Sequence, residues 1–301
     1  MTATAALRIG TRESRLAIAQ AEIAAEALQV VLGPAALVPI MTRGDEISAR
    51  QPNGRWVATD GQFTRELERA LLDGSVDLVV HSYKDLPTEP VDGLVIGAVL
   101  ERADPRDCLL TNDSGGLDDL PFGGRIGTSS PRRAAQLAAA RSDLIAMPIR
   151  GNVETRLRRL ESGEYDALLL AAAGLDRLGI AVPEIARLPL DLMLPAPAQG
   201  ALALQVRAED TALRAQLTTV DHAATRLAVD AERALLRRIG GGCLAPLGAL
   251  GEVDGDTLHL RAAYEDAGGT YLRAEASGPA ADPAAVVEQV ADAIRIELSR
   301  S

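Results

Sequence analysis

Aromatic side chains are almost absent from this chain of 301 residues, where phenylalanine, tryptophan and tyrosine together make up 2%. Because stacking platforms for nucleobases are built from such side chains, a single-stranded nucleic acid is not expected as a partner. An excess of positive charge is missing too, since the formal net charge is −11 at pH 7. The field of an acidic protein repels nucleic acids and anionic membrane surfaces alike, so neither is expected as the main partner.

Cysteine is scarce, with only Cys108 and Cys243 in the chain. Two cysteines cannot form the disulfide framework of a small secreted protein, and no cysteine–histidine spacing resembles a zinc site, so we expect no structural metal. No apolar run approaches the roughly 18 residues of a membrane span, and residues 1–10 lack the layout of a signal peptide. These absences predict a cytoplasmic protein.

Lysine occurs once, at Lys84, and every other cationic side chain is arginine. A biased nucleotide composition of the coding sequence would replace lysine by arginine wherever the two are equivalent. They are not equivalent where a compact ammonium group on a flexible stem is needed. Lys84 is therefore a candidate site residue. The alternative is that this one lysine was retained by chance.

What the chain does contain is typical of packed globular proteins, with 47% hydrophobic and 24% charged residues. Its length suggests two or three domains of about 100–200 residues each. Apolar spacing predicts strands over residues 7–9, 37–41 and 76–80, separated by helices over residues 14–31 and 63–72. This alternation predicts a largely parallel sheet with helices on both faces.

Short stretches of the first half recur later in the chain. Residues 8–11 read RIGT and lead to Arg15, and residues 125–128 read RIGT again and lead to Arg132 at the same offset. A looser repeat of the form R-x-L-x-x-G-x-x-D starts at residues 69 and 158. The same order of repeats indicates two α/β halves of like design, with accidental similarity as the alternative.

The C-terminal part has a different pattern. A proline-rich linker over residues 195–200 precedes an apolar strand over residues 201–206 and a helix over residues 225–239. Alternating residues 247–264 predict paired strands, and residues 283–298 predict a closing helix. We expect a small separate α+β domain at this end.

A turn with the sequence GTSSP at residues 127–131 has the composition of an anion site. Pro131 suits the first position of a helix, and the hydroxyl groups of Thr128, Ser129 and Ser130 can cap it. Free backbone amides and the positive end of the helix dipole favour an anion there. The alternative is an ordinary serine-capped helix followed by two solvated arginines, Arg132 and Arg133.

Two further turns have the same design, one over residues 10–14 and one over residues 150–152 with Arg156 a turn later. In an open α/β sheet, all these turns would lie at the carboxyl ends of strands, where ligand crevices form. Arginine binds carboxylates and phosphates in a strong bidentate geometry, so the ligand should carry several such groups. No Walker or G-x-G-x-x-G pattern is present, which disfavours nucleotides.

The segment HSYKDLPT at residues 81–88 leaves the strand predicted over residues 76–80. Asp85, beside the single lysine at a strand end, could transfer protons or stabilise a developing cation. The alternative is a surface ion pair before a proline turn. His222 and His259 stand alone and are interpreted as structural.

Cys243 follows three consecutive glycines, which leave room for another group to approach the backbone closely. An accessible thiol there could be a covalent anchor, whereas a buried, inert cysteine is the alternative. Cys108, in the apolar run DCLL, fits the inert description.

Together these motifs resemble those of the porphobilinogen deaminase, or hydroxymethylbilane synthase, family. The matching stretches span nearly the whole chain in order: RIGTRES (8–14), TRGD (42–45), HSYKDLP (81–87), DPRD (104–107), GTSSPRR (127–133), RGNV (150–153), EYDA (164–167), AAGL (172–175), QGA (199–201) and GGC (241–243).

The resemblance implies an α/β fold with two domains built like the lobes of type II periplasmic binding proteins around a cleft, followed by a small C-terminal α+β domain. On this basis we expect residues 1–102 with 197–217 to form the first domain. Residues 103–196 would form the second domain, and residues 218–301 the third, which would anchor the cofactor.

The resemblance also implies a transferase of heme biosynthesis that joins four porphobilinogen molecules head to tail. Each addition releases ammonia, and water then releases the linear tetrapyrrole hydroxymethylbilane. A dipyrromethane cofactor would be attached to Cys243 through a thioether. Asp85 would assist proton movements and stabilise a cationic intermediate. The resemblance also implies that the protein is a monomer, and it implies no metal.

Further site residues follow from the matched motifs. The residues implied to bind the cofactor are Cys243, Lys84, Asp85, Ser14, Thr128, Ser129, Ser130, Arg132, Arg133, Gly151 and Asn152. Those implied to bind substrate are Arg12, Ser14, Arg150, Arg156 and Arg177. An arginine-lined cleft suits a product that gains carboxylates at each step.

The sequence departs from the family pattern in two places. Residues 58–63 read ATDGQF where the family usually has GGKGLF, so Asp60 replaces a lysine and puts a contact of that loop to an anionic chain in doubt. Pro131 replaces a frequent leucine, which should only stiffen the helix start. The alternatives are a two-lobed solute-binding module without chemistry and an inactive family member. The GGGC loop and the retained Asp85 and Cys243 speak against them.

Overall fold

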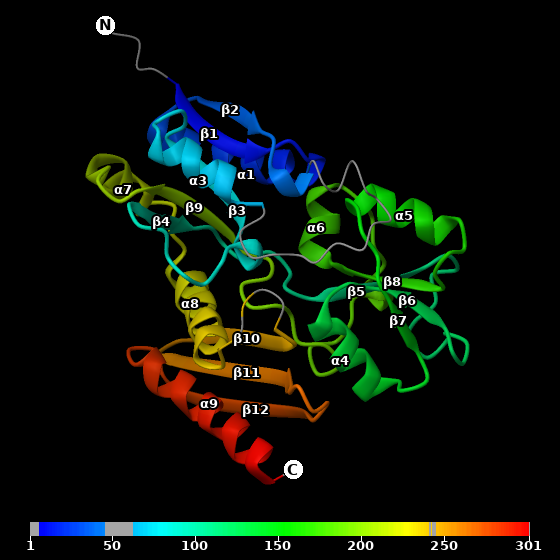
Figure 1. Cartoon of the computed structure of the whole chain (residues 1–301). Helices are drawn as coiled ribbons and strands as arrows, with labels where there is room; N and C mark the ends of the chain where they lie inside the picture. Colours follow the sequence, from blue (N-terminus) through cyan, green and yellow to red (C-terminus); the bar gives the residue numbers. More distant parts are fainter. Residues whose placement is uncertain (1–5, 46–62, 241, 243–244, 301) are drawn as a thin grey trace, which may run out of the picture. The chain divides into compact units, whose positions relative to one another are not determined.

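The computed structural model describes residues 6–45, 63–240, 242 and 245–300 (Figure 1). The chain separates into two compact units, each made of two segments. Unit 1 comprises Met1–Arg102 and Ala201–Arg226, and unit 2 comprises Ala103–Gly200 and Leu227–Ser301. Each unit is described by itself below.

The described residues of unit 1 form a five-stranded sheet in the order β2-β1-β3-β9-β4. Strand β1 is parallel to β2 and β3, whereas β9 is antiparallel to both of its neighbours, β3 and β4. The sheet is therefore mixed rather than largely parallel. The strand bounds are β1 (Leu7–Arg12), β2 (Ala35–Ile40), β3 (Leu78–Ser82), β4 (Leu94–Val99) and β9 (Leu202–Arg207), and the helices are α1 (Arg15–Leu32), α3 (Arg65–Leu72) and α7 (Thr211–Leu217).

Helix α1 covers this sheet with one apolar face. Ala21, Ala24 and Leu28 recur at helical spacing and are fully buried against Ile9 of β1 and Leu78 of β3. The side chain of Ser14 caps the first turn. Helix start and core contact thus agree with the apolar spacing that predicts a helix over residues 14–31.

Unit 2 contains a four-stranded sheet in the order β5-β8-β6-β7, in which β6 is parallel to β7 and β8 and β5 is antiparallel to β8. Leu169 of β8 packs with Leu137 of α4 on one face, and Leu168 packs with Leu160 of α5 on the other. Helices therefore cover both faces, as the sequence predicts. The bounds are β5 (Asp107–Thr111), β6 (Arg125–Gly127), β7 (Ile145–Met147), β8 (Ala167–Ala171), α4 (Pro131–Ala140), α5 (Val153–Glu161), α6 (Ala172–Arg177) and a 3-10 turn η2 (Glu184–Ala186).

The sequence repeats correspond to equivalent contacts in the two sheets. The backbone N–H of Arg8 donates to Oδ2 of Asp77 at 2.9 Å, and that of Arg125 donates to Oδ2 of Asp166 at 2.7 Å. The Nε atoms of both arginines reach the same carboxylate oxygens at 3.1 Å. Strand order β2-β1-β3 in unit 1 is matched by β7-β6-β8 in unit 2. The two halves of like design are thus present, and accidental similarity is wrong.

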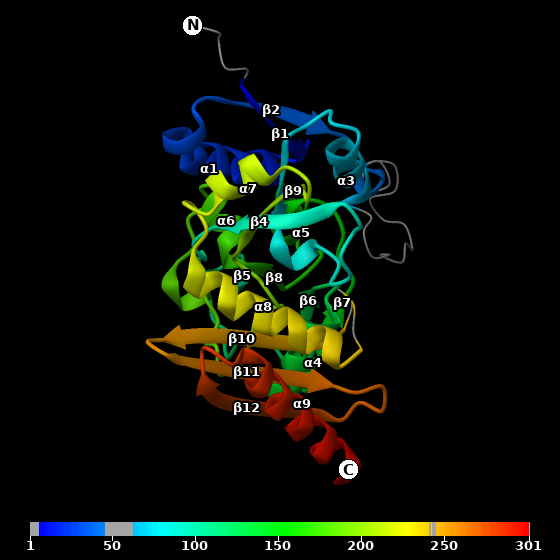
Figure 2. The same ribbon diagram turned by 90° about the vertical axis from the view of Figure 1, so that its left-hand side faces the viewer.

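A three-stranded antiparallel sheet in the order β10-β11-β12 follows in unit 2. One face, with Leu247 and Leu258, packs against α8 and α9, and Leu250 on the other face packs with Leu194. Figure 2 shows α9 running along this sheet. The predicted α+β arrangement at this end is present, within the same compact unit as the four-stranded sheet. Its elements are β10 (Leu247–Asp254), β11 (Thr257–Glu265), β12 (Tyr271–Pro279), α8 (Ala223–Arg238) and α9 (Pro283–Arg300).

Two element predictions need correction. Strand β3 starts at Leu78, two residues later than predicted, because the N–H of Val76 bonds to the carbonyl of Ala70 and still belongs to the turn after α3. Strand β12 was not predicted from the sequence. Its residues are half-buried or exposed, so its apolar signal is weak.

Candidate active site

Lys84 and Asp85 lie in a 3-10 turn, η1 (Tyr83–Asp85), that starts where β3 ends. Tyr83 anchors this turn, because its side chain is buried and its N–H donates to the carbonyl oxygen of Ala201 at 3.0 Å. Asp85 is exposed and Lys84 is half-buried. The predicted position at a strand end is confirmed, and the anchored turn exposes the Asp85 carboxylate to solvent.

Arg12 ends the neighbouring strand β1, at the same edge of the sheet. Its Nε donates to Oδ2 of Asp45 at 3.1 Å, and its Cζ lies 4.0 Å from the centroid of the Phe63 ring. Burial by itself would raise the pKa of Asp45, but the hydrogen bond and charge of Arg12 lower it on balance. The guanidinium group is therefore held in one orientation. Ser14 follows as the cap of α1.

His81 adds no positive charge to this edge. It is buried in β3, and its Nε2 lies 2.9 Å from Oε1 of Gln205 on β9. Burial lowers its pKa to about 4, so the ring is neutral at physiological pH.

In unit 2, the turn after β6 has the predicted capped form. Pro131 is the first residue of α4, and Oγ of Ser130 accepts the N–H of Arg133 at 3.4 Å. Oγ1 of Thr128 accepts the N–H of Ser130 at 3.2 Å. The turn that contains Thr128, Ser129 and Ser130 is thus stabilised by its own hydroxyl groups.

The second turn follows the neighbouring strand β7. Asn152 caps α5 by accepting the N–H of Thr155 at 2.9 Å, and Nε of Arg156 donates to the carbonyl of Gly151 at 2.8 Å. Gly151 has a φ of 102°, which favours glycine. Arg150, immediately before it, is half-buried. This turn lies beside the first one, because β6 and β7 are parallel neighbours.

Arg132 and Arg133 are buried around one carboxylate. Nη1 of Arg132 donates to Oδ2 of Asp107 at 2.7 Å, and Nη2 of Arg133 donates to Oδ1 at 2.7 Å. Asp107 is fully buried, and the two arginines are only 3% and 7% exposed. The alternative of two solvated arginines is wrong. Their role toward a ligand stays a prediction.

Asp107 remains ionised in this cluster. Burial alone would raise its pKa, but the charges of Arg132 and Arg133 lower it well below the usual range. The side-chain amide of Gln199 adds a hydrogen bond to Oδ1 at 2.9 Å. The Nε of Arg132 is buried without an acceptor among the residues that the structure describes.

Arg177 ends α6, the short helix that follows β8. One of its terminal nitrogens donates to the carbonyl oxygen of Gly200 at 2.6 Å. Burial lowers its pKa to about 10, so it stays cationic at pH 7. Because β8, β6 and β7 are parallel, Arg177 and the two capped turns share the carboxyl edge of one sheet.

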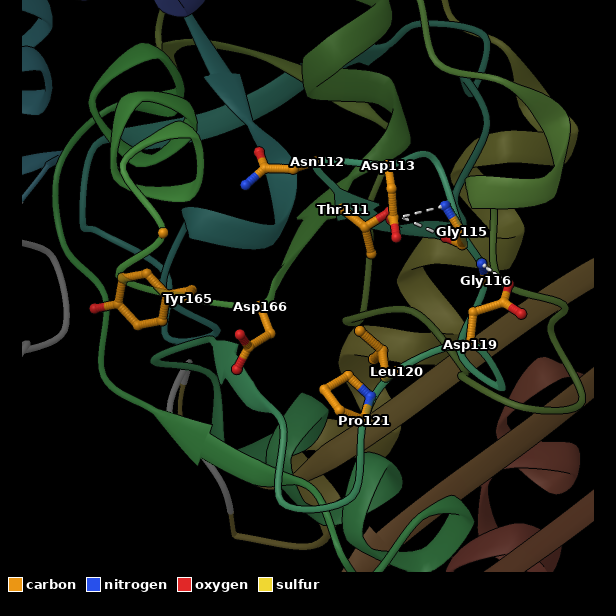
Figure 3. A pocket seen from close by; sticks show the side chains of 11 residues that line it. Thr111, Asn112, Asp113, Gly115, Gly116, Asp119, Leu120, Pro121, Tyr165 and Asp166 are labelled. Carbon is orange, nitrogen blue, oxygen red and sulfur yellow. Dashed lines mark hydrogen bonds between the residues drawn. The ribbon is translucent and has the colours of Figure 1, made fainter.

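A pocket of about 340 Å³ lies at the opposite edge of this sheet (Figure 3). It is lined by Thr111 at the end of β5 and by Asp166 just before β8. Asp113 and Asp119 in its wall accept N–H groups of their own loop. None of the predicted site residues lines it, so it is not the predicted ligand site.

Of the two cysteines, the structure describes only Cys108. Cys243 lies outside the described residues, as does Asp60 of the atypical loop. Cys108 is fully buried, and burial raises the pKa of its thiol to about 11. It is therefore a protonated core thiol, as predicted, and a poor nucleophile.

The described part of the chain lacks both a membrane-spanning helix and a cluster of metal ligands. No helix there is both long and apolar enough to span a membrane. No group of at least three His, Cys, Asp or Glu side chains within the described ranges is arranged to hold a metal ion.

Comparison with protein families gives two matches along the chain. Residues 7–215 match the model for the dipyrromethane cofactor binding domain of porphobilinogen deaminase. Residues 226–295 match the model for its C-terminal domain. The chain belongs to the porphobilinogen deaminase family.

Relatives in this family are similar over almost their whole length. The porphobilinogen deaminase of Desulforudis audaxviator (strain MP104C) is 48% identical, over 94% of this chain and 92% of that protein. That of Stenotrophomonas maltophilia (strain R551-3) is 44% identical, over 95% and 94%. Among solved structures, the periplasmic aliphatic sulphonate binding protein SsuA from Escherichia coli aligns with a TM-score of 0.39 and 17% identity, covering 78% of this chain and 70% of that one.

The porphobilinogen deaminase cofactor, a dipyrromethane that carries acetate and propionate groups, fits the chemistry of the residues present. The carboxyl edge in unit 2 supplies guanidinium groups and capped helix starts, which bind carboxylates. The buried Nε of Arg132 is a donor that lacks an acceptor among the described residues, and a carboxylate oxygen would satisfy it.

No role was assigned from the sequence to several residues that contact the predicted site residues or their neighbours. Asp107 and Gln199 stand in matched motifs but had no assigned role, and Asp45 and Tyr165 were likewise only quoted. An acid at the start of the apolar run CLL was the available signal for Asp107, since a carboxylate entering a buried strand needs charged partners. No local pattern identified Arg132 and Arg133 as those partners.

Proposed function

We propose that this chain condenses four porphobilinogen molecules head to tail, releasing ammonia at each addition, to form hydroxymethylbilane for heme biosynthesis. This would make it a transferase. The observation that carries the proposal is the exposed Asp85, which lies beside Lys84 in the turn at the end of β3, in a chain that belongs to the porphobilinogen deaminase family. The retained Asp85 supports an active enzyme over an inactive family member.

Asp85 is the proposed catalytic residue. Its exposed carboxylate can accept a proton at one oxygen and stabilise positive charge that develops on a pyrrole substrate. Lys84 provides a cation next to it for a substrate or cofactor carboxylate. Arg12, oriented by Asp45, and Ser14 would bind a further carboxylate from the same edge of the sheet.

The residues of unit 2 would bind the other acetate and propionate groups. Guanidinium groups grip such carboxylates in a bidentate geometry, and the backbone amides of the two capped turns add donors. We assign this role to Arg150, Gly151, Asn152, Arg156, Arg177, Thr128, Ser130, Arg132 and Arg133. Arg132 and Arg133 would do so while Asp107 keeps them in place.

Cys243 is the proposed attachment point of the dipyrromethane, through a thioether. When bound, this group supplies a covalent starting point for the growing chain. We also propose the three-domain division inferred from the resemblance, with residues 1–102 and 197–217, 103–196 and 218–301. A cytoplasmic monomer completes the proposal, on the family resemblance.

Replacing Asp85 with alanine tests the central role. We expect turnover of porphobilinogen to fall by about 10²–10⁴-fold, the usual contribution of a positioned acid or base. The melting temperature should stay near that of the unaltered protein, because Asp85 is exposed. Asp92→Ala, at another exposed turn acid, is the matched control and should keep full activity. Near-normal turnover in Asp85→Ala would remove Asp85 from its role.

Replacing Arg150 with alanine tests the carboxylate sites. We expect chain elongation to stall, because one guanidinium group that binds the growing chain is lost. Intact-protein mass spectrometry after brief exposure to porphobilinogen should then show early adducts accumulating. Arg158→Ala removes an exposed arginine of the adjoining helix α5 and should leave the distribution unchanged. The same adduct pattern in Arg150→Ala and the unaltered protein would contradict the assignment.

A further inference from the structure

Ser129 was predicted to bind the cofactor, but its hydroxyl group is engaged within the protein. Oγ of Ser129 donates to the carbonyl oxygen of Ile149 at 2.7 Å and accepts the N–H of Ile149 at 3.0 Å. The preceding contact is a backbone bond from the N–H of Thr128 to the carbonyl of Met147 at 2.8 Å. One side chain thus continues the β6–β7 ladder where backbone pairing ends, since Gly127 and Met147 are the last paired residues.

A hydroxyl group has one proton to donate. In Ser129 that proton is directed at the carbonyl of Ile149. A ligand carboxylate accepts hydrogen bonds and donates none, so the Ser129 hydroxyl could bind it only by giving up its bond to Ile149. The geometry therefore favours a role within the protein over direct contact with the ligand.

Tyr165 contacts the same segment from the face of the sheet that α5 covers. Its hydroxyl donates to the carbonyl oxygen of Pro148 at 2.8 Å, and the residue as a whole is 2% exposed. A Cβ atom at Gly127 would lie only 3.1 Å from Cδ1 of this ring, so the ring packs directly against β6. Figure 3 shows the ring pointing away from Asp113 and Asp119 of the pocket. The Tyr165 hydroxyl instead holds the turn at Pro148 through its hydrogen bond.

The segment held in this way carries proposed binding groups. Pro148 and Ile149 lead directly into Arg150 and Gly151, and the carbonyl of Gly151 receives Nε of Arg156 at 2.8 Å. A Cβ atom at Gly151 would lie 2.8 Å from Cγ2 of Thr155, so this turn has little room to shift toward α5. A displacement of Ile149 would therefore move the donors of the whole turn.

We propose that Ser129 is a positioning residue, which fixes the Arg150–Asn152 turn through both peptide groups of Ile149, with the Tyr165 hydroxyl as a second support. The inference rests on the proposed function, because it takes this turn to bind the carboxylates of the growing chain. Its effect on the reaction passes through Arg150 and Gly151.

Amide hydrogen exchange tests the contact without any turnover. In Ser129→Ala, exchange at the Ile149 amide should accelerate about tenfold, as expected for the loss of one hydrogen bond. Ser129→Thr keeps the hydroxyl at an exposed position and should restore protection. Ser162→Ala, which removes a hydroxyl at the far end of α5, should leave Ile149 unchanged. Unchanged exchange in Ser129→Ala, or no restoration in Ser129→Thr, would overturn the proposed contact.

Steady-state kinetics and intact mass distinguish positioning from direct cofactor binding. Ser129→Ala should raise KM for porphobilinogen about tenfold with a smaller change in kcat, while the covalently bound mass is retained. Tyr165→Phe keeps the buried ring and should show a weaker effect of the same kind. Loss of the bound mass in Ser129→Ala, or an unaltered KM in both variants, would overturn the positioning role. If the unaltered protein fails to turn over porphobilinogen, the proposed function fails, whereas the exchange result still decides the contact.

Discussion

Replacing Asp107 with alanine is expected to lower the free energy of unfolding by about 3–5 kcal/mol. The change would leave the guanidinium groups of Arg132 and Arg133 buried without a counter-charge, and it would remove the acceptor of the Gln199 amide. Urea unfolding followed by circular dichroism measures the effect as a lower midpoint at unchanged slope.

Asp166→Ala is the matched control for this prediction. Asp166 also pairs with an arginine, Arg125, but both side chains are partly exposed, at 32% and 43%. Pairs of this kind contribute about 0–1 kcal/mol, so the control should lose little stability. Equal losses of unfolding free energy in the two variants would show that the buried cluster around Asp107 stabilises the protein no more than an exposed ion pair does.

The contribution of Asp107 to the free energy of unfolding should also depend on pH. Arg132 and Arg133 hold the pKa of Asp107 well below its usual range, although burial opposes them. The unfolded chain therefore takes up this proton at a higher pH, near about 4, than the folded protein does. The contribution is complete above that pH and is lost as the pH falls toward the folded pKa. The difference in stability between the unaltered protein and Asp107→Ala should shrink accordingly.

Replacing Cys243 with serine is expected to abolish turnover and to lower the intact mass by one dipyrromethane beyond the substitution itself. The reason is that serine offers no thiolate for a thioether. Mass spectrometry of the purified protein gives the result directly, and kinetic assays with porphobilinogen give the activity.

Cys108→Ala is the control for the anchor. Cys108 is buried and its thiol stays protonated, so this variant should keep the bound mass. A protein that carries no added mass yet is fully active would contradict the anchor at Cys243. Loss of the mass in Cys108→Ala alone, with Cys243→Ser unaffected, would transfer the role to the buried thiol.

Much of the local architecture follows from short-range patterns. Apolar spacing predicts α1 and the Ser14 cap, and the GTSSP sequence predicts the capped start of α4 with Pro131 in its first turn. The repeated RIGT stretches predict two related halves. These features depend on residues within one or two turns of each other, so the sequence displays them directly.

Other features depend on residues far apart in the chain. Strand β9 was identified as apolar, but its antiparallel place between β3 and β4 comes from pairing across more than a hundred residues. Strand β12 escaped detection because half of its residues face solvent. The alternative of two solvated arginines at Arg132 and Arg133 is wrong for the same reason, since their partner Asp107 lies 25 residues away from Arg132 along the chain.

By itself, the sequence determined the family, the alternation of strands and helices, and the turns that carry Asp85 and the arginines. Only the tertiary structure decided which groups pair with those arginines. It also decided that the Ser129 hydroxyl bonds to Ile149 and that the Tyr165 hydroxyl bonds to Pro148. The physical reason is that a hydrogen bond or ion pair in a buried site depends on which groups the fold brings within about 3 Å of each other. Spacing along the chain does not specify that distance.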